Sequence, residues 1–498
     1  MERFLIQWLL LLAVISHTSC FQTEISYKIR EYVREHQYLV YARHDPIEEY
    51  TLEQPLDHFE PSQKTLKQRY WVNANYWRKE DGPVFLYIGG EAEISGAAID
   101  YGNIVALAEQ YSGLLFAVEH RYYGLSTFED YLETENLKYL SSQQALADLA
   151  EFCVFAQKTY KLTDQNQWVA YGGSYPGNLA AWFRLKYPHL VKAAVASSAP
   201  VQAKTDFQDY KNVAAASFAS PLVGGSMQCQ KNIMEAFAYV NQLIAQKDFT
   251  TLERDFLSCN DISQPNDTWL FVENIGNFLD GIVQYNSQAP AGFSIAYVCQ
   301  TMTNASLTPY QSLGYLIRYY LDHLRLPCVN NNYTAYLEIF KNTTQDPTGS
   351  SMIRQWIYQT CTQFGYYQTC EKNTSCIYSK VPHDLEYDLD ICFEAYDIPA
   401  QDVYERVAFT NAYYGGKTPK GSKIVFVNGS IDPWHALSVL TNQSASEVAI
   451  FIPGTSHCAN MLPDSPDDPP ALCEARKQVA ALIGEWLEAS RSSLDISH

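Results

Sequence analysis

Basic residues are scarce in this chain. Its 498 residues include 35 Lys and Arg against 55 Asp and Glu, which gives a formal net charge of −20. Nucleic-acid-binding proteins carry basic patches, and anionic membrane surfaces attract basic segments. We therefore expect neither a nucleic acid nor a membrane surface as a partner. The excess of carboxylates fits two interpretations, a general need for solubility and function in an acidic compartment. Composition alone leaves both open.

The sequence also lacks an apolar run long enough to span a membrane, which takes about 20 residues. The run at 4–15 follows Arg3 and precedes small residues at 18–20, a pattern typical of a cleaved signal peptide. We therefore predict a signal peptide over 1–20, no membrane span, and a location in the secretory pathway, either lysosomal or endosomal or secreted. A propeptide over 21–49 stays open.

No C-x-x-C pair occurs among the 12 cysteines, which argues against zinc and thioredoxin-like sites. In an oxidising compartment we expect disulfides instead. The cysteines crowd between Cys229 and Cys392, so that stretch is predicted to be cross-linked. Removing Cys20 with the signal leaves an odd number and at least one free thiol, and the pairing stays open.

Glycosylation sequons support the secretory route. We predict glycans at Asn266, Asn304, Asn332, Asn342, Asn373 and Asn442. Asn428 also begins a sequon, but it ends an apolar strand beside a candidate site and is a poor acceptor.

Two parts of the chain alternate short apolar runs with helical patterns, which is typical of an α/β fold with a parallel sheet. The predicted strands are 84–88, 114–118, 168–171, 193–196, 423–427 and 448–452, and the predicted helices beside them are 142–160, 179–187 and 471–489. The middle has long amphipathic stretches, at 234–247 and 310–324, and most of the sequons. We therefore predict a mostly parallel sheet domain over 21–204 and 406–498, with a mainly helical, disulfide-containing cap inserted over 205–405.

The first chemical motif surrounds Ser174, in the run GGSYPG after a predicted strand and before a predicted helix. This context favours a nucleophile elbow, a sharp turn that lifts a serine hydroxyl above the sheet of an α/β-hydrolase. Pro176 stands where the second glycine of G-x-S-x-G is usual, and proline is tolerated in the first turn of a helix. Gly- and Ser-rich turns are common in proteins, so this motif alone leaves a catalytic serine and an ordinary turn both open.

Asp432 and His457 supply those partners. Each lies just beyond a predicted strand, at the carboxyl edge where open α/β sheets place their sites. The order Ser, acid, His is that of α/β-hydrolases. Singly, Asp432 reads equally well as a turn residue and His457 as a loop histidine; together the three predict a catalytic triad.

An oxyanion hole requires two donors. We predict one at the N–H of Tyr175 and the other in the loop of Gly90 and Glu91, after strand 84–88. The run EHRYYG at 119–124 also follows a strand. Its Glu119, Arg121 and Tyr123, together with Trp434, are candidate substrate-binding residues, and a structural ion-pair cluster is the alternative for the run.

Several segments together resemble the family of lysosomal Pro-Xaa carboxypeptidase, dipeptidyl peptidase II and thymus-specific serine peptidase. They are GGSYPG (172–177), EHRYYG (119–124), LSSQQALADLA (140–150), ASSAPV (196–201), WIYQTCTQFG (356–365), TNAYYGG (410–416), NGSIDPWH (428–435) and GTSHCANM (454–461). YQTCTQFG, TNAYYGG and SHC are most similar to the thymus-specific branch. Pro176 and Gln363 depart from the family pattern, which usually has Gly or Ala and Glu there.

The resemblance implies an α/β-hydrolase domain with a helical cap, a triad of Ser174, Asp432 and His457, and no metal or organic cofactor. It also implies a peptide substrate, and some members cleave next to proline in acidic vesicles. We therefore predict a serine exopeptidase, with carboxypeptidase and dipeptidyl-peptidase modes both open. The alternatives are an esterase or lipase on the same triad and a catalytically silent binding protein. The oligomeric state, with a homodimer as one candidate, stays open.

Overall fold

The computed structural model describes residues 22–42, 47–60, 64–128, 132–290, 292–346, 352–371, 374–378 and 384–494. The predicted signal peptide (1–20) and the sequon at Asn373 lie outside the described residues. None of the described helices is both long and apolar enough to cross a membrane.

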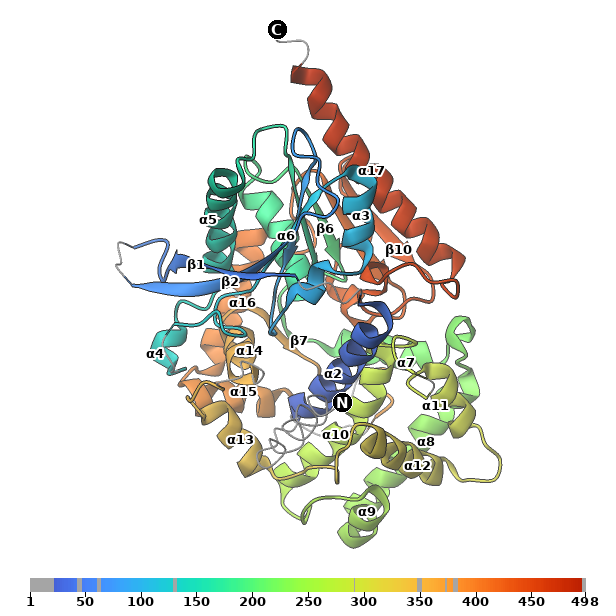
Figure 1. The fold of residues 1–498 in the computed structure, drawn as a ribbon. Helices are drawn as coiled ribbons and strands as arrows, with labels where there is room; N and C mark the ends of the chain where they lie inside the picture. Colours follow the sequence, from blue (N-terminus) through green and yellow to red (C-terminus); the bar gives the residue numbers. More distant parts are fainter. Residues whose placement is uncertain are drawn as a thin grey trace, which may run out of the picture.

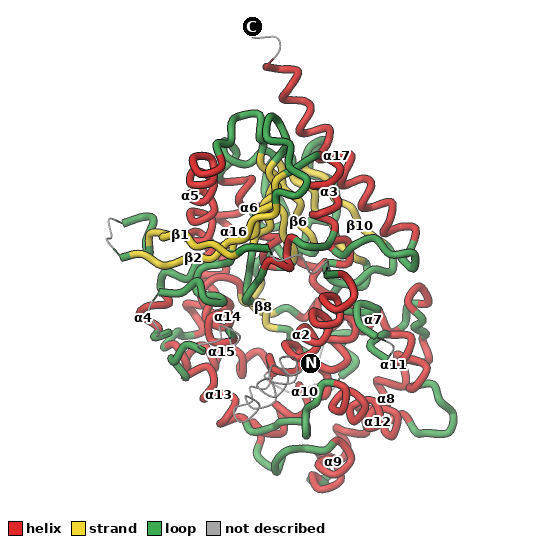
Figure 2. The backbone as a smooth tube through the Cα atoms, in the orientation of Figure 1, coloured by secondary structure: helices red, strands yellow, loops and turns green. Residues whose placement is uncertain are grey.

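One central sheet has eight strands in the order β1-β2-β4-β3-β5-β6-β9-β10. Figure 2 shows the sheet in yellow with helices in red around it. The six strands from β4 to β10 in this order run parallel, whereas β2 is antiparallel to both its neighbours. The strands are β1 (Glu49–Pro55), β2 (Thr65–Asn73), β3 (Val84–Ile88), β4 (Leu114–Val118), β5 (Trp168–Gly173), β6 (Ala193–Ser197), β9 (Ile424–Gly429) and β10 (Glu447–Ile452). The mostly parallel sheet of an α/β-hydrolase is therefore confirmed, and the antiparallel edge of β1 and β2 is an addition that the strand patterns did not predict.

Helices cover both faces of the sheet (Figure 1). On one face lie α3 (Asn103–Tyr111) and α17 (Pro470–Leu494); on the other lie α5 (Ser142–Tyr160), α6 (Tyr175–Lys186) and α16 (Ala400–Tyr414). Successive strand residues serve opposite faces, as β4 shows with Phe116 in one core and Leu115 in the other. Burial on both faces explains why the strands read as unbroken apolar runs.

A mainly helical cap, residues 208–396, is inserted between β6 and β9 and lies below the sheet in Figure 1. Its elements are α7 (Gln208–Phe218), α8 (Met227–Ala245), α9 (Phe249–Phe256), α10 (Pro265–Gln284), α11 (Ile295–Met302), α12 (Pro309–His323), α13 (Tyr333–Lys341), α14 (Ile353–Gln359) and α15 (Asp384–Tyr396). The short strand β7 (Lys204–Asp206), just before the cap, pairs in parallel with β8 (Gly365–Tyr367), between α14 and α15. The predicted cap boundaries at 205 and 405 remain predictions, and the second of them falls inside α16.

All disulfides among the described residues lie in this region: Cys229–Cys299, Cys259–Cys328, Cys361–Cys392 and Cys370–Cys376. Each joins helices or loops of the cap, as the crowding of its cysteines predicted. Three described thiols are free: Cys153, Cys458 and Cys473.

The N-terminal helix α2 (Gln22–Tyr41) packs with the cap although it precedes the sheet in the chain. Its Ile25, Ile29 and Val33 are buried in the same apolar core as α10 and α12. A Cβ on Gly281 would lie 2.4 Å from Ile29 Cδ1, so the tip of the Ile29 side chain packs directly against the backbone of α10. The helix is therefore built into the molecule as part of the cap's core.

Candidate active site

Ser174 lies at the sharp turn between β5 and α6, with φ 63° and ψ −134°. This left-handed region is costly for a residue with a side chain, and such strain gathers at functional sites. The Ser174 N–H donates to Ser197 O at 2.9 Å, and the Asn178 N–H donates to Ser174 O at 3.2 Å. The strained turn is thus held by the neighbouring strand and the first turn of α6.

Two glycines allow this turn to pack. A Cβ on Gly172 would lie 2.2 Å from Pro176 O, and one on Gly177 would lie 2.8 Å from Ser197 O. Neither position tolerates a side chain, because the atoms it would meet belong to the backbone. Pro176 lies in the first turn of α6, where its missing N–H costs no hydrogen bond, so the elbow geometry survives the departure from G-x-S-x-G.

Asp432 and His457 form a buried pair. Both carboxylate oxygens of Asp432 lie 3.0 Å from His457 Nδ1, and the two residues are 0% and 4% exposed. Asp432 also accepts a hydrogen bond from the Trp434 N–H at 3.0 Å, which fixes the carboxylate at the start of a short helix. With Nδ1–H donating to Asp432, the lone pair of the imidazole is on Nε2.

The loop of His457 is attached to the cap. The His457 N–H donates to Gln284 O at 3.0 Å, and Gln288 Nε2 donates to His457 O at 2.6 Å. Burial alone lowers the pKa of His457, but the Asp432 carboxylate, with a further contribution from Cys458, raises that pKa well above its ordinary value. The sheet domain, through Asp432, therefore sets the charge state of His457, and the cap, through Gln284 and Gln288, sets its position.

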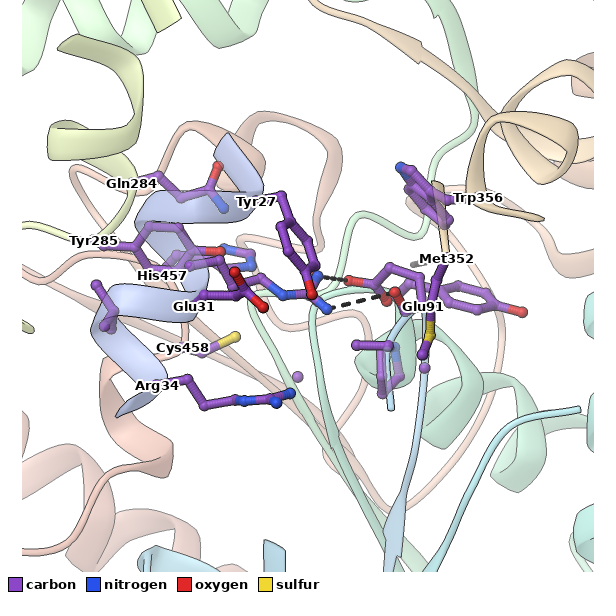
Figure 3. Close-up of a pocket in the computed structure, with 18 of the residues that line it drawn as sticks. Tyr27, Glu31, Arg34, Glu91, Gln284, Tyr285, Met352, Trp356, His457 and Cys458 are labelled. Atoms are coloured by element: carbon purple, nitrogen blue, oxygen red, sulfur yellow. Dashed lines mark hydrogen bonds and ion pairs between the residues drawn. The ribbon is translucent and has the colours of Figure 1, made fainter. Parts of the chain in front are cut away.

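Ser174 and His457 line one cavity of about 1170 Å³ between the sheet domain and the cap. Figure 3 shows this cavity with His457 and Cys458 on one side, Trp356 from the cap on the other, and side chains of α2 such as Tyr27 and Arg34. Trp434, a candidate substrate-binding residue, also lines it. The cavity is large enough for several residues of a peptide, and junctions between domains are where ligand sites are common.

The predicted oxyanion residues line the same cavity: Tyr175 begins α6, and Gly90 and Glu91 follow β3. A Cβ on Gly90 would lie 2.3 Å from Pro176 Cγ, so the loop touches the first turn of α6. The Tyr175 hydroxyl is 2.9 Å from His120 Nε2, and burial lowers the pKa of His120 to about 4. Neutral His120 thus braces the residue whose N–H is the predicted donor.

Three predicted substrate-binding residues lie elsewhere. Glu119, Arg121 and Tyr123 are each 0% exposed, and none lines the cavity. Glu119 binds Arg69 through oxygen–nitrogen distances of 2.6 and 2.8 Å, and Arg121 binds Asp148 through two distances of 2.6 Å. Their polar atoms are therefore used within the fold, and the placement supports the alternative, a structural ion-pair cluster.

The cap supplies residues that sequence reasoning missed. Gln284 Oε1, at the end of α10, accepts hydrogen bonds from Trp434 Nε1 at 3.0 Å and from the Tyr210 hydroxyl at 2.7 Å. Gln359 Nε2 donates to the Tyr175 hydroxyl at 3.1 Å. Amphipathic helices carry no local motif for such roles, and only the lone Gln at the end of an apolar helix marks Gln284.

The predicted glycan acceptors are placed outside the site. Asn266, Asn304, Asn342 and Asn442 are exposed, and Asn332 is partly buried because its side chain caps α13. Asn428 is 1% exposed, in line with its rejection as an acceptor. Glycosylation itself stays a prediction.

Comparison with known proteins decides the family. The model of the family described as Serine carboxypeptidase S28 matches residues 54–479. The thymus-specific serine protease of Homo sapiens is 36% identical over 450 residues, which cover 89% of this chain and 87% of that protein. This chain belongs to the serine carboxypeptidase S28 family.

A lysosomal relative shares fewer residues with this chain. The lysosomal Pro-X carboxypeptidase of Homo sapiens is 28% identical over 90% of this chain and 89% of its own length. A solved proline iminopeptidase from Mycobacterium smegmatis has a TM-score of 0.36 and 10% identity over 89% of this chain and 100% of that one, which is too little to support an argument. Family membership makes the chain a serine peptidase, and the resemblance found in its motifs is confirmed.

Proposed function

We propose that this peptidase cleaves peptides through an acyl-enzyme, with Ser174 as nucleophile, His457 as general base and acid, and Asp432 as the group that orients His457. The observation that carries this is the buried Asp432–His457 pair, whose histidine lines the same cavity as the strained Ser174. These are the parts and the chain order of an α/β-hydrolase triad.

In the first half of the reaction, Ser174 Oγ attacks the carbonyl carbon of the substrate while its proton passes to His457 Nε2. The oxyanion is held by the N–H of Tyr175 and by an N–H of the Gly90–Glu91 loop. Asp432 accepts the hydrogen bond of Nδ1–H and stabilises the imidazolium. The imidazolium then protonates the leaving amine, the C–N bond breaks, and an acyl-Ser174 ester remains.

In the second half, water takes the place of the amine. Neutral His457 removes its proton, the hydroxide attacks the ester carbon, and the second tetrahedral intermediate uses the same oxyanion donors. Collapse returns the proton to Ser174 Oγ and releases the acid. In both halves of the reaction His457 is the group that accepts the proton and then donates it.

We further propose that the enzyme is an exopeptidase with a preference linked to proline, acting in the secretory or lysosomal route. Support for the exopeptidase mode comes from the position of the cavity between the sheet domain, the cap and α2, which favours chain ends over the middle of a folded protein. The name of the Pro-X relatives and the aromatic lining by Trp356, Tyr366 and Trp434 support the proline preference. The disulfides and the exposed sequons support the route.

The test is labelling by a fluorophosphonate probe at pH 5 and pH 7, followed by digestion of a peptide library. We expect wild type and Ser263→Ala, which changes an exposed loop serine outside every sequon, to be labelled, and Ser174→Ala to be unlabelled. Removal of residues only from chain ends would support the exopeptidase mode. Labelling that persists in Ser174→Ala would overturn the triad, and internal cleavage would overturn the mode.

A further inference from the structure

The Lys and Arg side chains around the cavity come from one helix, α2, which also contributes Glu31 and Glu35 to the lining. Among the described residues that line it, every Lys and Arg belongs to α2: Lys28, Arg30 and Arg34. Apart from His457 of the candidate triad, the titratable acids and bases that the lining outside α2 contributes with a charge at neutral pH are six carboxyl groups: Glu91, Glu93, Glu273, Asp346, Asp384 and Asp388. Without α2, the walls of the cavity are therefore acidic.

One cation of α2 contacts the loop beside the elbow. Arg30 Nη1 donates to Glu91 Oε1 at 2.9 Å, and Arg30 Nη2 donates to Glu91 O at 3.4 Å. Glu91 Oε2 is buried and has no hydrogen-bond partner among the described residues. This carboxylate therefore holds one guanidinium and keeps an acceptor oxygen for another donor.

Two other acidic residues of the lining, Glu93 and Glu273, pair with cations from outside α2. Glu93 binds Arg69 at 3.0 Å, and Glu273 binds Lys211 at 3.1 Å; neither cation belongs to α2 or lines the cavity. The cation that the structure places on Glu91 comes from α2 alone, and α2 precedes residues 54–479, the part matched by the family model.

We propose that the Glu91 carboxylate is a subsite for a cationic group of the peptide substrate, and that Arg30 occupies it in this structure as an internal competitor. This rests on the proposed function, since it assumes that the peptide is cleaved at Ser174. Gly90 lies against Pro176, so a cation on Glu91 belongs to a residue close to the scissile bond. Its source is either the N-terminal ammonium or a Lys or Arg side chain.

Two conservative variants separate the parts of the proposal. Arg30→Met keeps the apolar stem and removes the guanidinium, and Glu91→Gln keeps the shape and removes the charge. Lys28→Met is the matched control, because Lys28 lines the cavity on the same helix but its Nζ pairs with Glu31 within α2, at 3.0 Å. Melting temperatures identify any variant that fails to fold, and the substrate preference of wild type tests the subsite without a variant.

The substrates form matched sets of peptides with free or acetylated N-termini, each with Lys or norleucine near the scissile bond. Because hydrogen bonds between charged groups are worth more than neutral ones, we expect wild type to prefer a cationic set, and Arg30→Met to raise kcat/KM for that set about tenfold by lowering KM. Glu91→Gln should abolish the preference, and Lys28→Met should leave it unchanged. The set that responds identifies the source of the cation.

An unchanged preference in Glu91→Gln, no preference in wild type, or an Arg30→Met variant no faster than wild type would overturn the subsite. In each of these cases, probe labelling that still depends on Ser174 would leave the proposed function standing. Loss of that dependence would remove the proposed function and the subsite with it.

Discussion

The sheet domain and the cap contribute to the candidate site in different ways. The sheet domain places Ser174, Asp432 and His457 at the ends of strands, where the backbone itself aims each side chain. The cap places Gln284 at the end of α10 and Gln288 in the turn after it, where they hold the His457 loop in position. The sheet domain thus supplies the candidate catalytic groups, and the cap holds them in place. Substitutions in the two regions should therefore differ both in the size of their effect and in the property that they change.

The largest effect is expected within the sheet domain. Asp432→Asn keeps the shape of the side chain but reverses the hydrogen bond to His457, so kcat should fall about 10⁴-fold. Steady-state kinetics on the best peptide substrate, with the melting temperature as a fold check, make the measurement. Asp164→Asn, at an exposed site, is the control, and a loss in Asp432→Asn below about tenfold would contradict the assigned role.

The second effect concerns the stability of the cap. The Cys259–Cys328 bond closes a separation of 69 residues, so replacing both cysteines with serine should lower the free energy of unfolding by about 3–5 kcal/mol. Denaturant unfolding should show an early transition, with probe labelling lost in that same transition. Cys473→Ser, which changes a free thiol, should stay within about 0.5 kcal/mol of wild type. If the double variant matched Cys473→Ser, the cap would not depend on this bond.

A smaller effect follows from removing one positioning side chain of the cap. Gln284→Ala leaves Trp434 Nε1 and the Tyr210 hydroxyl without their shared acceptor, so kcat/KM should fall about tenfold. Gln246→Ala, which changes an exposed glutamine at the end of α8, should have no such effect. Equal kinetics for the two variants would show that Trp434 keeps its position without the cap.

The smallest effect is a displacement along the pH axis. Asp432 and Cys458 raise the pKa of His457, and only the neutral imidazole accepts a proton, so activity should rise with pH through a midpoint above 6.5. Cys458→Ala removes one of the raising contributions and should move the acid limb to lower pH. Profiles of kcat/KM against pH for the two proteins test this, and a limb that stays in place or moves upward would contradict it.

The elements of the sheet domain could be predicted because their signals are local. Apolar runs mark β3, β4, β5, β6, β9 and β10, and polar motifs directly after three of them mark Ser174, Asp432 and His457. The roles of Glu119 and Arg121 could not be predicted, because their partners Arg69 and Asp148 lie 50 and 27 residues away in the chain. The disulfide pairing, the antiparallel β1–β2 edge and the place of α2 depend on similar distant contacts.

The attachment of the His457 loop to the cap limits the size of the substrates that the enzyme can accept. Gln284 and Gln288 hold that loop through three hydrogen bonds, to the His457 N–H, the His457 carbonyl and the Ser456 hydroxyl. If the cap moved away to admit a folded protein, these hydrogen bonds would pull His457 away from Asp432. We expect the enzyme to admit unstructured peptides and to leave the folded proteins of its compartment intact.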